Sequence, residues 1–544
     1  MRGGSLTASA LWLLVMAAAI ATRPFLPVDE TRYLAVAWEM WHGGNYLVPH
    51  LNGETYSHKP PLLFWLINAG WAVFGLNDWW PRLVAPLFGL TSLWLTAGLA
   101  RRLWPDAPAA ANAAPLIAFG SIFWALFTTL TMFDMMLTFC ALVGMHGIVR
   151  ARQTNSPNGL WLLSLAIGIG ALTKGPAILL TTLPVALLAP FWAPVLAGDI
   201  WDRGWKRWYA EISWALLLGI VIGLIWAIPA AINGGDDYRD AIFWGQSAGR
   251  MVNSFAHGRP WWWFAATLPV LLMPWTIWPA LWRSLGGLFA KADGGMRFCL
   301  AWLLPALLVF SVISGKQFHY LLPVFPAIAL IIARLLTTAS VSPHADAWHR
   351  TGLLLPALMF FLPGLALFGL GIADLLVDLP AWAGRLNTLW GLALAIAAAG
   401  AFHFGRGLDL QARLVTLASL AAALVVTIHL AARPLLSETF DLQPISMKIG
   451  DWQRQDIPLA FIGKYHGQFQ YLGRLEKPIS IVGLQRPDMQ NWIAAHPDGY
   501  VIAVRKRWPE GLEPLVQVPF RGRNIAVFDI PQVLAHPDFF DIRQ

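Results

Sequence analysis

Long apolar runs separated by short polar segments dominate the pattern of this chain. Runs of this length suit membrane-spanning helices, because strands of a membrane barrel need only about 10 residues. The pattern therefore predicts a polytopic α-helical membrane protein. Thirteen runs are candidate spans: roughly 6–23, 82–101, 109–130, 134–150, 158–173, 176–195, 212–233, 261–282, 297–313, 320–338, 351–372, 385–404 and 411–432.

One further apolar run, 61–76, is predicted to lie along the membrane surface. If it does, and the amino terminus is cytoplasmic, most loop arginines and lysines fall on the cytoplasmic side, as membrane proteins prefer. A span at 61–76 would invert every later loop. The segment 24–81 then becomes an external loop with surface helices, one near 31–42. That helix would gather Tyr33, Ala37, Met40 and Trp41 on one face.

The carboxy-terminal tail has a different pattern, with more charge and short alternating segments. Strands are predicted at 479–483, 500–504 and 524–528, and helices at 447–455 and 488–495. A stretch of this length can bury a small core. We predict two domains: a transmembrane domain over 1–433, which includes the external loops 24–81 and 234–260, and an external α/β domain over 434–544.

Composition agrees with this class. The chain is 57% hydrophobic and only 12% charged, which excludes a soluble globular protein. The net charge of +8 fits cytoplasmic loops that face anionic membrane lipids, and no segment resembles a nucleic-acid-binding surface. Both cysteines, Cys140 and Cys299, lie in apolar runs, so no disulfide framework is expected. The first apolar run, after Arg2, is interpreted as a retained span rather than a signal peptide.

The predicted topology brings unusual polar residues to the external face. Charged groups next to the hydrocarbon are costly and commonly mark a functional site. Two plainer interpretations stay open: Asp134 could cap its helix and Lys174 could extend to the headgroups. The set is Asp29, Glu30, Arg32, Tyr56, His58, Lys59, Asp134, Lys174, Arg250, His257, Arg259, Lys316, His319 and Tyr320.

Carboxylates beside cationic groups at a membrane surface suit group transfer from a lipid-linked phosphate. Lysine and arginine would hold the phosphate and stabilise the leaving group, and an aspartate would deprotonate or orient an acceptor hydroxyl. Positive charge at Arg250 and Arg259, in an external loop, also indicates an anionic ligand. A divalent ion is possible chemically, with His58 and His257 as candidate ligands, but no local ligand pair supports it.

Several of these residues form an ordered set of motifs: Pro27-Val-Asp-Glu-Thr-Arg-Tyr33, Lys59-Pro-Pro61, Asp134 at the start of a span, Thr173-Lys-Gly-Pro176, His257-Gly-Arg-Pro-Trp-Trp262 and Lys316-x₃-Tyr320-x-Leu-Pro323. The set resembles the bacterial 4-amino-4-deoxy-L-arabinose (aminoarabinose) lipid A transferases. These enzymes are related to the protein O-mannosyltransferases within the C-type membrane glycosyltransferases. The resemblance covers most of residues 20–330.

The resemblance implies a polyprenyl-phosphate sugar donor, thirteen spans, and an active site and carboxy-terminal domain on the periplasmic face of the bacterial inner membrane. It implies catalytic carboxylates at Asp29, Glu30 and Asp134. The implied substrate and phosphate contacts are Arg32, Tyr56, Lys59, Lys174, Arg250, Arg259, Lys316 and Tyr320. The family tends to have glutamate where this chain has His58, and that glutamate is associated with a metal there. A Zn²⁺ or Mg²⁺ cofactor on His58 and His257 is therefore left open.

The expected function is transfer of aminoarabinose or a related sugar from polyprenyl phosphate to lipid A or another envelope acceptor, by a monomer. A protein O-mannosyltransferase-like enzyme is the alternative within the same class. A transporter or flippase for an anionic lipid is less favoured, because transporters show paired repeats and polar groups at midplane depth. A non-catalytic scaffold would leave Asp29, Glu30 and Lys59 without a purpose.

Overall fold

The computed structural model describes residues 3–245, 258–285, 292–340 and 352–540. They form two compact units. Unit 1 comprises residues 1–21, 57–63 and 78–431, and unit 2 comprises residues 22–56, 64–77 and 432–544. Each unit is described by itself.

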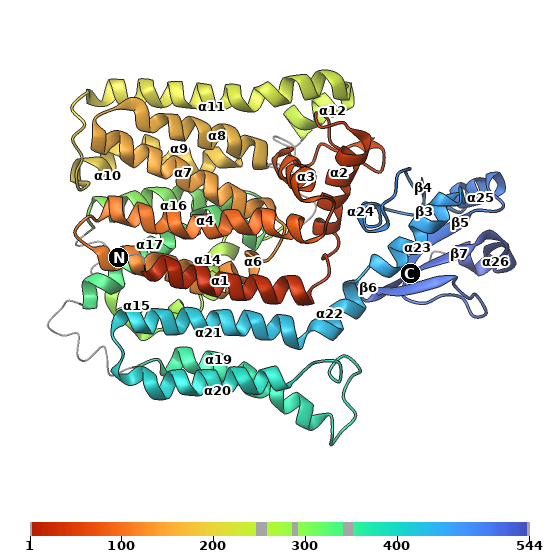
Figure 1. Ribbon diagram of the computed structural model, residues 1–544. Helices are drawn as coiled ribbons and strands as arrows, with labels where there is room; N and C mark the ends of the chain where they lie inside the picture. Colours follow the sequence, from red (N-terminus) through yellow and green to blue (C-terminus); the bar gives the residue numbers. More distant parts are fainter. Residues whose placement is uncertain (1–2, 246–257, 286–291, 341–351, 541–544) are drawn as a thin grey trace. The chain divides into compact units, whose positions relative to one another are not determined.

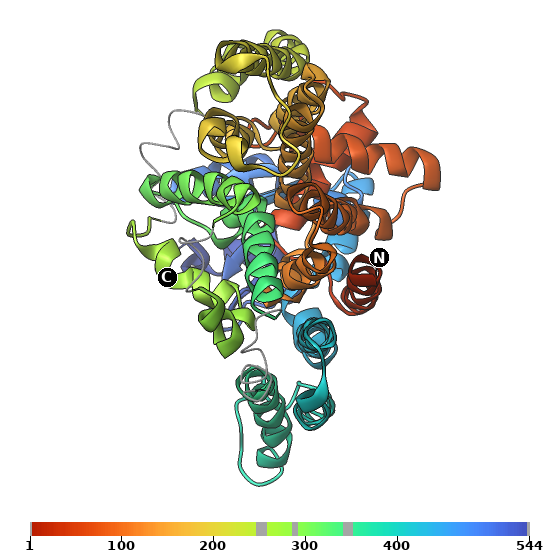
Figure 2. The same ribbon diagram turned by 90° about the vertical axis from the view of Figure 1, so that its left-hand side faces the viewer.

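Unit 1 is a bundle of helices. Figure 1 shows its long helices running side by side, and Figure 2 shows them nearly end-on. Its elements are α1 (Gly3–Thr22), α4 (Trp79–Leu103), α5 (Pro108–Gly120), α6 (Ile122–Phe127), α7 (Phe133–Thr154), η1 (Pro157–Gly159), α8 (Leu160–Lys174), α9 (Ala177–Leu187), α10 (Ala189–Trp192), η2 (Ala193–Val195), α11 (Gly204–Gly234), α12 (Asp236–Asp240), η3 (Ala241–Gly245), α14 (Trp263–Leu271), η4 (Trp275–Ile277), α15 (Pro279–Ser284), α16 (Gly294–Val312), η6 (Phe318–Val324), α17 (Phe325–Ser340), α19 (Leu354–Ala373), α20 (Leu389–Phe404), η7 (Gly405–Gly407) and α21 (Leu410–Ala431).

All thirteen predicted spans contain helix, but five are short or interrupted. Within the described residues, eight helices are long and apolar enough to cross a membrane unbroken, or nine if the bent pair α9–α10 counts as one span. That pair bends by 48°. The run 109–130 divides at Ser121, which is extended between α5 and α6. Proline explains another break, because Pro274 lies between α14 and η4 and Pro279 is the first residue of α15, and neither can donate to a preceding helical turn.

Close packing of small residues brings neighbouring helices of unit 1 together. A Cβ atom on Gly147 of α7 would lie 2.6 Å from the carbonyl oxygen of Gly159, and one on Gly219 of α11 would lie 2.7 Å from the Ile167 side chain of α8. Packing, rather than a hydrophobic effect, must hold helices together inside lipid, so such contacts contribute directly to helix association.

Unit 2 combines the segment after α1 with the carboxy-terminal tail. Its first part contains α2 (Asp29–Gly43), the hairpin β1 (His50–Leu51) and β2 (Glu54–Thr55), and most of α3 (Leu62–Phe74). Its second part contains α22 (Arg433–Phe440), α23 (Gln443–Arg454), β3 (Leu459–Ile462), α24 (Gln470–Gly473), β4 (Ser480–Val482), α25 (Arg486–Ala495), β5 (Tyr500–Arg505), β6 (Val516–Phe520), β7 (Arg523–Asp529), α26 (Ile530–Ala535) and η8 (Pro537–Phe540).

The tail forms a five-stranded mixed sheet of order β4-β3-β5-β7-β6. Strand β3 pairs in parallel with β4 and β5, whereas β7 pairs antiparallel with β5 and β6. The structure confirms the predicted strands at β4, β5 and β7 and the predicted helices at α23 and α25. Strands β3 and β6 were not predicted. Strand β3 is buried along its whole length and therefore has no alternation of apolar and polar residues, whereas β6 has an alternating burial pattern.

The compact units differ from the predicted domains. The junction at 431/432 lies close to the predicted 433/434 boundary, but most of the loop 24–81 packs with the tail instead of the transmembrane helices. The Asn52 amide donates to the carbonyl of Ile479 at 2.9 Å, and the Trp38 indole donates to the carbonyl of Leu475 at 2.7 Å. These buried bonds join the two parts of unit 2 into one fold.

The run 61–76 forms α3, whose 13 residues are too few to cross a bilayer. The Asn68 amide donates to the carbonyl of Ala37 on α2 at 3.1 Å, and the Trp71 ring stacks on Tyr471 with centroids 5.2 Å apart. Helix α3 therefore packs as part of unit 2. The predicted helix near 31–42 is confirmed as α2, with Tyr33, Ala37 and Met40 buried and Trp41 half-buried; its placement at the membrane surface stays a prediction.

Candidate functional site

Unit 1 contains a cavity of about 460 Å³ with a mixed lining. The polar part includes His58, Lys59, Asp134, Lys174 and Tyr320. The rest is mainly apolar and comes largely from α7, α8, α9, α11 and α16; it includes Leu137, Ile167, Leu179, Leu224, Trp226 and Phe310. The cavity thus joins a cationic region to a hydrocarbon-like one, which is the arrangement that an amphiphile with an anionic head requires.

Asp134 and Lys174 form the central ion pair of this cavity. Asp134 lies in the first turn of α7 and is buried, and Lys174 ends α8. The Lys174 ammonium lies 2.5 Å from the Asp134 carboxylate and 4.9 Å from the centre of the Tyr320 ring. Neither plainer interpretation fits this geometry: Asp134 pairs with Lys174 across two helices, and the Lys174 side chain is only 14% exposed.

Lys59 brings a second ammonium to the cavity. It follows His58 in a loop before α3, and both residues line the cavity. The Lys59 ammonium lies 5.7 Å from the centre of the Phe133 ring, next to Asp134 in sequence. Among the described residues, the fully charged ones that line the cavity are two lysines and one aspartate. The lining therefore has a net positive charge. A phosphate head would complement it.

Asp29 opens α2, in unit 2, and its carboxylate remains accessible. Its side chain is 54% exposed and forms an ion pair with Arg32, one helical turn later. The Tyr33 hydroxyl lies 3.5 Å from the same carboxylate oxygen. Burial alone would lower the pKa of Arg32. The electrostatic effects of Tyr56, Tyr33 and Asp29 together exceed the effect of burial, so the pKa is raised. The guanidinium therefore stays charged beside Asp29.

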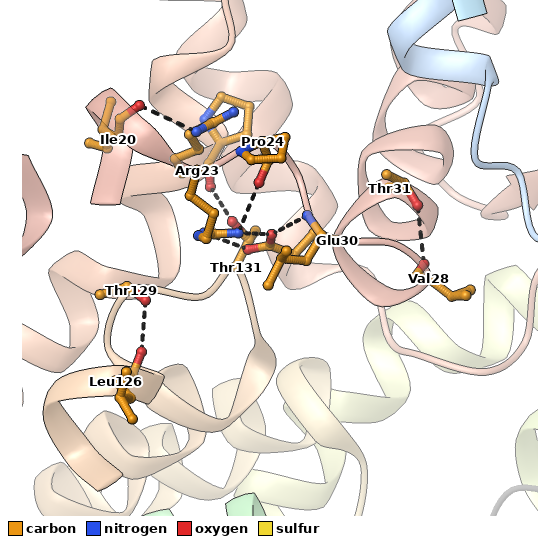
Figure 3. A network of polar contacts seen from close by, with 12 residues as sticks. Ile20, Arg23, Pro24, Val28, Glu30, Thr31, Leu126, Thr129 and Thr131 are labelled. Carbon is orange, nitrogen blue, oxygen red and sulfur yellow. Dashed lines mark hydrogen bonds and ion pairs between the residues drawn. The ribbon is translucent and has the colours of Figure 1, made fainter. Parts of the chain in front are cut away.

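Glu30 has a different environment, although it is the next residue. Its carboxylate is only 3% exposed and pairs with the Arg23 guanidinium, whose second nitrogen lies 3.1 Å from the other carboxylate oxygen. The backbone amide of Leu26 donates to it at 2.8 Å. Figure 3 shows these two side chains facing each other. These contacts fix the turn before α2, and the predicted catalytic role of Glu30 stays a prediction.

Tyr56 is buried and packs edge-on against Phe64, with ring centroids 6.2 Å apart. It lies in unit 2, and the chain enters unit 1 at Ser57, just before His58 and Lys59. Its phenol interacts with the charge of Arg32. Its predicted contact with a substrate stays a prediction.

Lys316 and Arg259 do not line the cavity. The buried Lys316 ammonium donates to the backbone carbonyls of Arg259, at 3.0 Å, and Ile313. Gly258 and Gly315 form an isolated β-bridge beside it. Lys316 thus ties two loops together, and this bonding differs from the predicted phosphate contact. The Arg259 side chain is exposed. Arg250 and His257 lie outside the described residues.

The sequence analysis missed two contributors to the region around Asp29. Arg23, the first charged residue after α1, fixes Glu30; its position beside an apolar run could have indicated a buried partner. The loop between β3 and α24 is the second. Its Gly467 has φ +72°, and a Cβ atom there would lie 3.1 Å from Ala35 of α2, so only glycine allows this approach.

His466, beside Gly467, lies within range of the charges around Asp29. Burial, helped by the positive charges of Arg32, Lys464 and Arg521, lowers the pKa of His466 to about 4. Its imidazole is therefore neutral at pH 7. No local pattern in the sequence connects residue 466 with residue 29, since only the fold of unit 2 brings them together.

A metal centre is not assembled by the described part of the chain. No group of three or more histidine, cysteine, aspartate or glutamate side chains gathers there in a form that could hold an ion. His58 lines the cavity beside Asp134, which is already paired with Lys174. Of the two candidate ligands, only His58 belongs to the described residues, and no chemical step is derived through a metal.

Comparison with known proteins gives relatives in sequence. The family of dolichyl-phosphate-mannose-protein mannosyltransferases matches residues 58–232. The undecaprenyl phosphate-α-4-amino-4-deoxy-L-arabinose arabinosyl transferase of Pseudomonas aeruginosa is 31% identical over 333 residues, which cover 60% of this chain and 58% of the relative. The enzyme of the same name from Edwardsiella ictaluri is 31% identical over 336 residues, covering 61% and 59%. The matched region thus spans less than two thirds of these relatives.

Comparison with solved structures extends to nearly the whole chain. The crystal structure of ArnT from Cupriavidus metallidurans matches 97% of this chain and 98% of its own, at 18% identity. The TM-score is 0.70 for the apo state and 0.69 for the state bound to undecaprenyl phosphate. The chain therefore shares the fold of this ArnT, and it is similar in sequence and in fold to the bacterial aminoarabinose transferases, as its motifs indicated.

Proposed function

We propose that this protein is a membrane glycosyltransferase that moves aminoarabinose, or a related sugar, from a polyprenyl phosphate to lipid A or another envelope acceptor. The observation that carries the proposal is the cavity of unit 1, which joins two lysines to an apolar wall. The relatives are named for undecaprenyl phosphate-linked aminoarabinose transfer, and the matching crystal structure holds undecaprenyl phosphate. Both facts support the choice of donor.

In the proposed reaction the bond between the sugar C1 and the donor phosphate oxygen breaks, and C1 forms a bond with an acceptor oxygen. The polyprenyl phosphate leaves with an additional negative charge. Lys59 and Lys174 stabilise that charge, which develops in the transition state, by electrostatic attraction. Asp134 orients the Lys174 ammonium through their 2.5 Å contact. The apolar wall holds the first units of the polyprenyl chain.

Asp29 is the proposed base in unit 2. Its carboxylate is half-exposed, whereas that of Glu30 is enclosed. If the acceptor is a hydroxyl, its proton passes to the Asp29 carboxylate as the new glycosidic bond forms. Arg32, held beside Asp29, keeps this carboxylate oriented.

The proposed location is the bacterial inner membrane, with the active site and unit 2 on the periplasmic face and the protein acting as a monomer. The match of the mannosyltransferase family to residues 58–232 favours a second candidate, a protein O-mannosyltransferase-like enzyme. The two candidates share the donor chemistry and differ in the acceptor.

The decisive experiment supplies purified protein with a synthetic polyprenyl-phosphate sugar and either lipid A or unfolded envelope proteins. Mass spectrometry of both acceptors should show the added sugar on lipid A. Sugar on protein instead would identify the second candidate. Modification of neither acceptor, with aminoarabinose and mannose donors both tested, would contradict the proposal.

The cavity itself is tested through Lys59. Lys59→Ala should weaken binding of polyprenyl phosphate and slow transfer together, because the phosphate loses a charged partner in both the ground and transition states. Lys59→Arg should restore part of both, since a planar guanidinium does not replace a compact ammonium. Lys448→Ala, on the exposed surface of α23, is the matched control.

A divalent ion held by His58 and His257 is a separate proposal. Zinc would be favoured over magnesium, because imidazole nitrogen is a ligand that zinc prefers. Metal analysis of the purified protein, with His58→Ala and His257→Ala in parallel, tests it. Stoichiometric zinc that is lost in both variants is the supporting result; full activity of metal-free protein in chelator would end the proposal.

A further inference from the structure

A second cavity of unit 1 lies between α8 and α11, away from the lysine-lined one. It is a groove of about 470 Å³, formed by Leu160, Trp161 and Ser164 of α8 and by Glu211, Trp214 and Val221 among the residues of α11. Trp161 and Trp214 are 60% and 70% exposed. Within the stretch of α11 that lines the groove, Gly219 packs against Ile167 of α8, so the two helices approach closely there.

Glu211 is the only charged residue in the lining of this groove. Its side chain is 12% exposed, and one oxygen, Oε1, accepts from Arg203 at 3.0 Å and from Arg207 at 2.9 Å. The other oxygen, Oε2, is buried and has no hydrogen-bond partner among the described residues. Buried carboxylate oxygens are nearly always hydrogen-bonded, so Oε2 requires a donor that the described residues do not supply.

The position of this carboxylate defines the donor. It lies at the boundary between an apolar groove, flanked by two exposed tryptophans, and a pair of arginines near the start of α11. Exposed tryptophans at such a boundary are typical of the membrane interface. The Arg207 side chain is 61% exposed, so its guanidinium has further N–H groups available for an anion. The groove thus offers a wall for an acyl chain, arginines for a phosphate and a carboxylate oxygen for an amine.

We propose that this groove binds a glycerophospholipid with a primary-amine headgroup, whose ammonium donates to Glu211 Oε2 and whose phosphate accepts from Arg207 and Arg203. The acyl chain lies between Trp161 and Trp214. Phosphatidylethanolamine has this chemistry. A choline headgroup has the same net charge but no N–H donor, and a glycerol headgroup has no cation. The site is independent of the proposed glycosyl transfer.

The test uses the purified full chain in detergent, titrated with phosphatidylethanolamine, phosphatidylcholine and phosphatidylglycerol of identical acyl chains, with bound lipid counted by native mass spectrometry. The wild-type protein should bind phosphatidylethanolamine about tenfold more tightly than either of the other lipids, as one charge-assisted hydrogen bond would give. Glu211→Gln should remove this preference. Asp106→Asn, an exposed carboxylate in the turn before α5, should keep it.

The apolar wall has its own pair of variants. Trp214→Ala should weaken all three lipids by a similar factor, whereas Ile225→Ala, which is 69% exposed on α11 beyond the groove, should change none. Equal binding of the ethanolamine and choline lipids by the wild-type protein would overturn the proposal, and so would a preference that survives Glu211→Gln. The wild-type comparison decides the question even if a variant fails to fold.

Discussion

Asp29 and Glu30 are neighbours in the chain, yet their carboxylates lie in opposite environments. Successive residues of a helix point about 100° apart, so one side chain can face solvent while the next is enclosed. Asp29 is 54% exposed and paired with a helical neighbour, whereas Glu30 is 3% exposed and paired with Arg23. The first geometry permits proton transfer, and the second stabilises a turn.

This difference gives a prediction for Asp29. Asp29→Asn keeps the size of the side chain but removes the base and the charge, so transfer should fall by ~10²–10⁴-fold while the protein remains folded. Turnover by purified protein, with thermal unfolding in parallel, measures both effects. Asp451→Asn, exposed on α23, is the control. Near-normal turnover in Asp29→Asn would remove this residue from the chemistry.

Glu30 should behave in the reverse way. Glu30→Gln leaves the Arg23 guanidinium buried without its counter-charge, which typically costs about 3–5 kcal/mol. The unfolding midpoint should fall clearly, whereas Glu54→Gln, on the exposed strand β2, should leave it unchanged. A stable Glu30→Gln protein without activity would instead return Glu30 to the catalytic residues.

At the scale of residues, the sequence analysis found the polar set but could not assign every role. It located Asp134, Lys174, Lys59 and Tyr320, which the structure brings to one cavity. It also selected Lys316, whose ammonium bonds to two backbone carbonyls. Lys174 and Lys316 are both lysines within a few residues of the end of a predicted span, so only the packing of loops distinguishes them.

At the scale of elements, α2 depends on a loop from the tail. The segment between β3 and α24 approaches α2 through Gly467, and a buried polar network continues behind it. The Gln470 amide donates to Asn52 at 2.6 Å, and the amides of Asn52 and Gly53 donate to the Glu39 carboxylate of α2. Despite these bonds, burial raises the pKa of Glu39.

His466 makes the stability of this arrangement depend on pH. Its folded-state pKa is about 4, below the ordinary value of 6.5. Between these values the unfolded chain binds a proton that the folded protein does not, so stability should fall as pH decreases from about 6.5 to 4. Thermal unfolding across this range should show the fall, and His466→Gln should reduce its slope. His42→Gln, exposed at the end of α2, is the control; an unchanged slope in His466→Gln would contradict the assignment.

The apolar pattern was sufficient to predict where the helices lie, but it was less informative about where they bend or divide. Hydrophobic length alone located the helices of all thirteen runs. The bend between α9 and α10 and the division of α5 from α6 depend on local packing, which a hydropathy pattern does not contain. Strand β3 was missed for a related reason: buried on both faces, its four residues carry no period of two.

At the scale of the whole molecule, the main correction concerns connectivity. The external loop was assigned to the transmembrane domain because it follows the first span, but its hydrogen bonds reach residues more than 400 positions away, as from Asn52 to Ile479. Contacts at that separation leave no local signal in one sequence. The fold class and the boundary near 431 were predictable, because both follow from composition.

Topology is the remaining prediction at this scale. In a background where Cys140 and Cys299 are replaced, single cysteines at Asn77 and Gly235 should react with an impermeant reagent added to the periplasmic side. Cysteines at Gly204 and Gly294 should react only from the cytoplasmic side, since positively charged loops favour that side. Cytoplasmic labelling at position 77 would mean that α3 crosses the membrane.

Unit 2 is assembled from segments that are far apart in the sequence, and this affects its folding during synthesis. The ribosome completes Asn77 about 355 residues before it reaches Ala432, where the second part of unit 2 begins. At about 5–20 residues per second this interval is roughly 20–70 s. During that time α2 and the β1–β2 hairpin have neither the five-stranded sheet nor α24 to pack against. These segments must therefore avoid aggregation until the tail has been synthesised. A chain truncated before residue 432 could complete the lysine-lined cavity, but Asp29 would lose the scaffold that holds its helix.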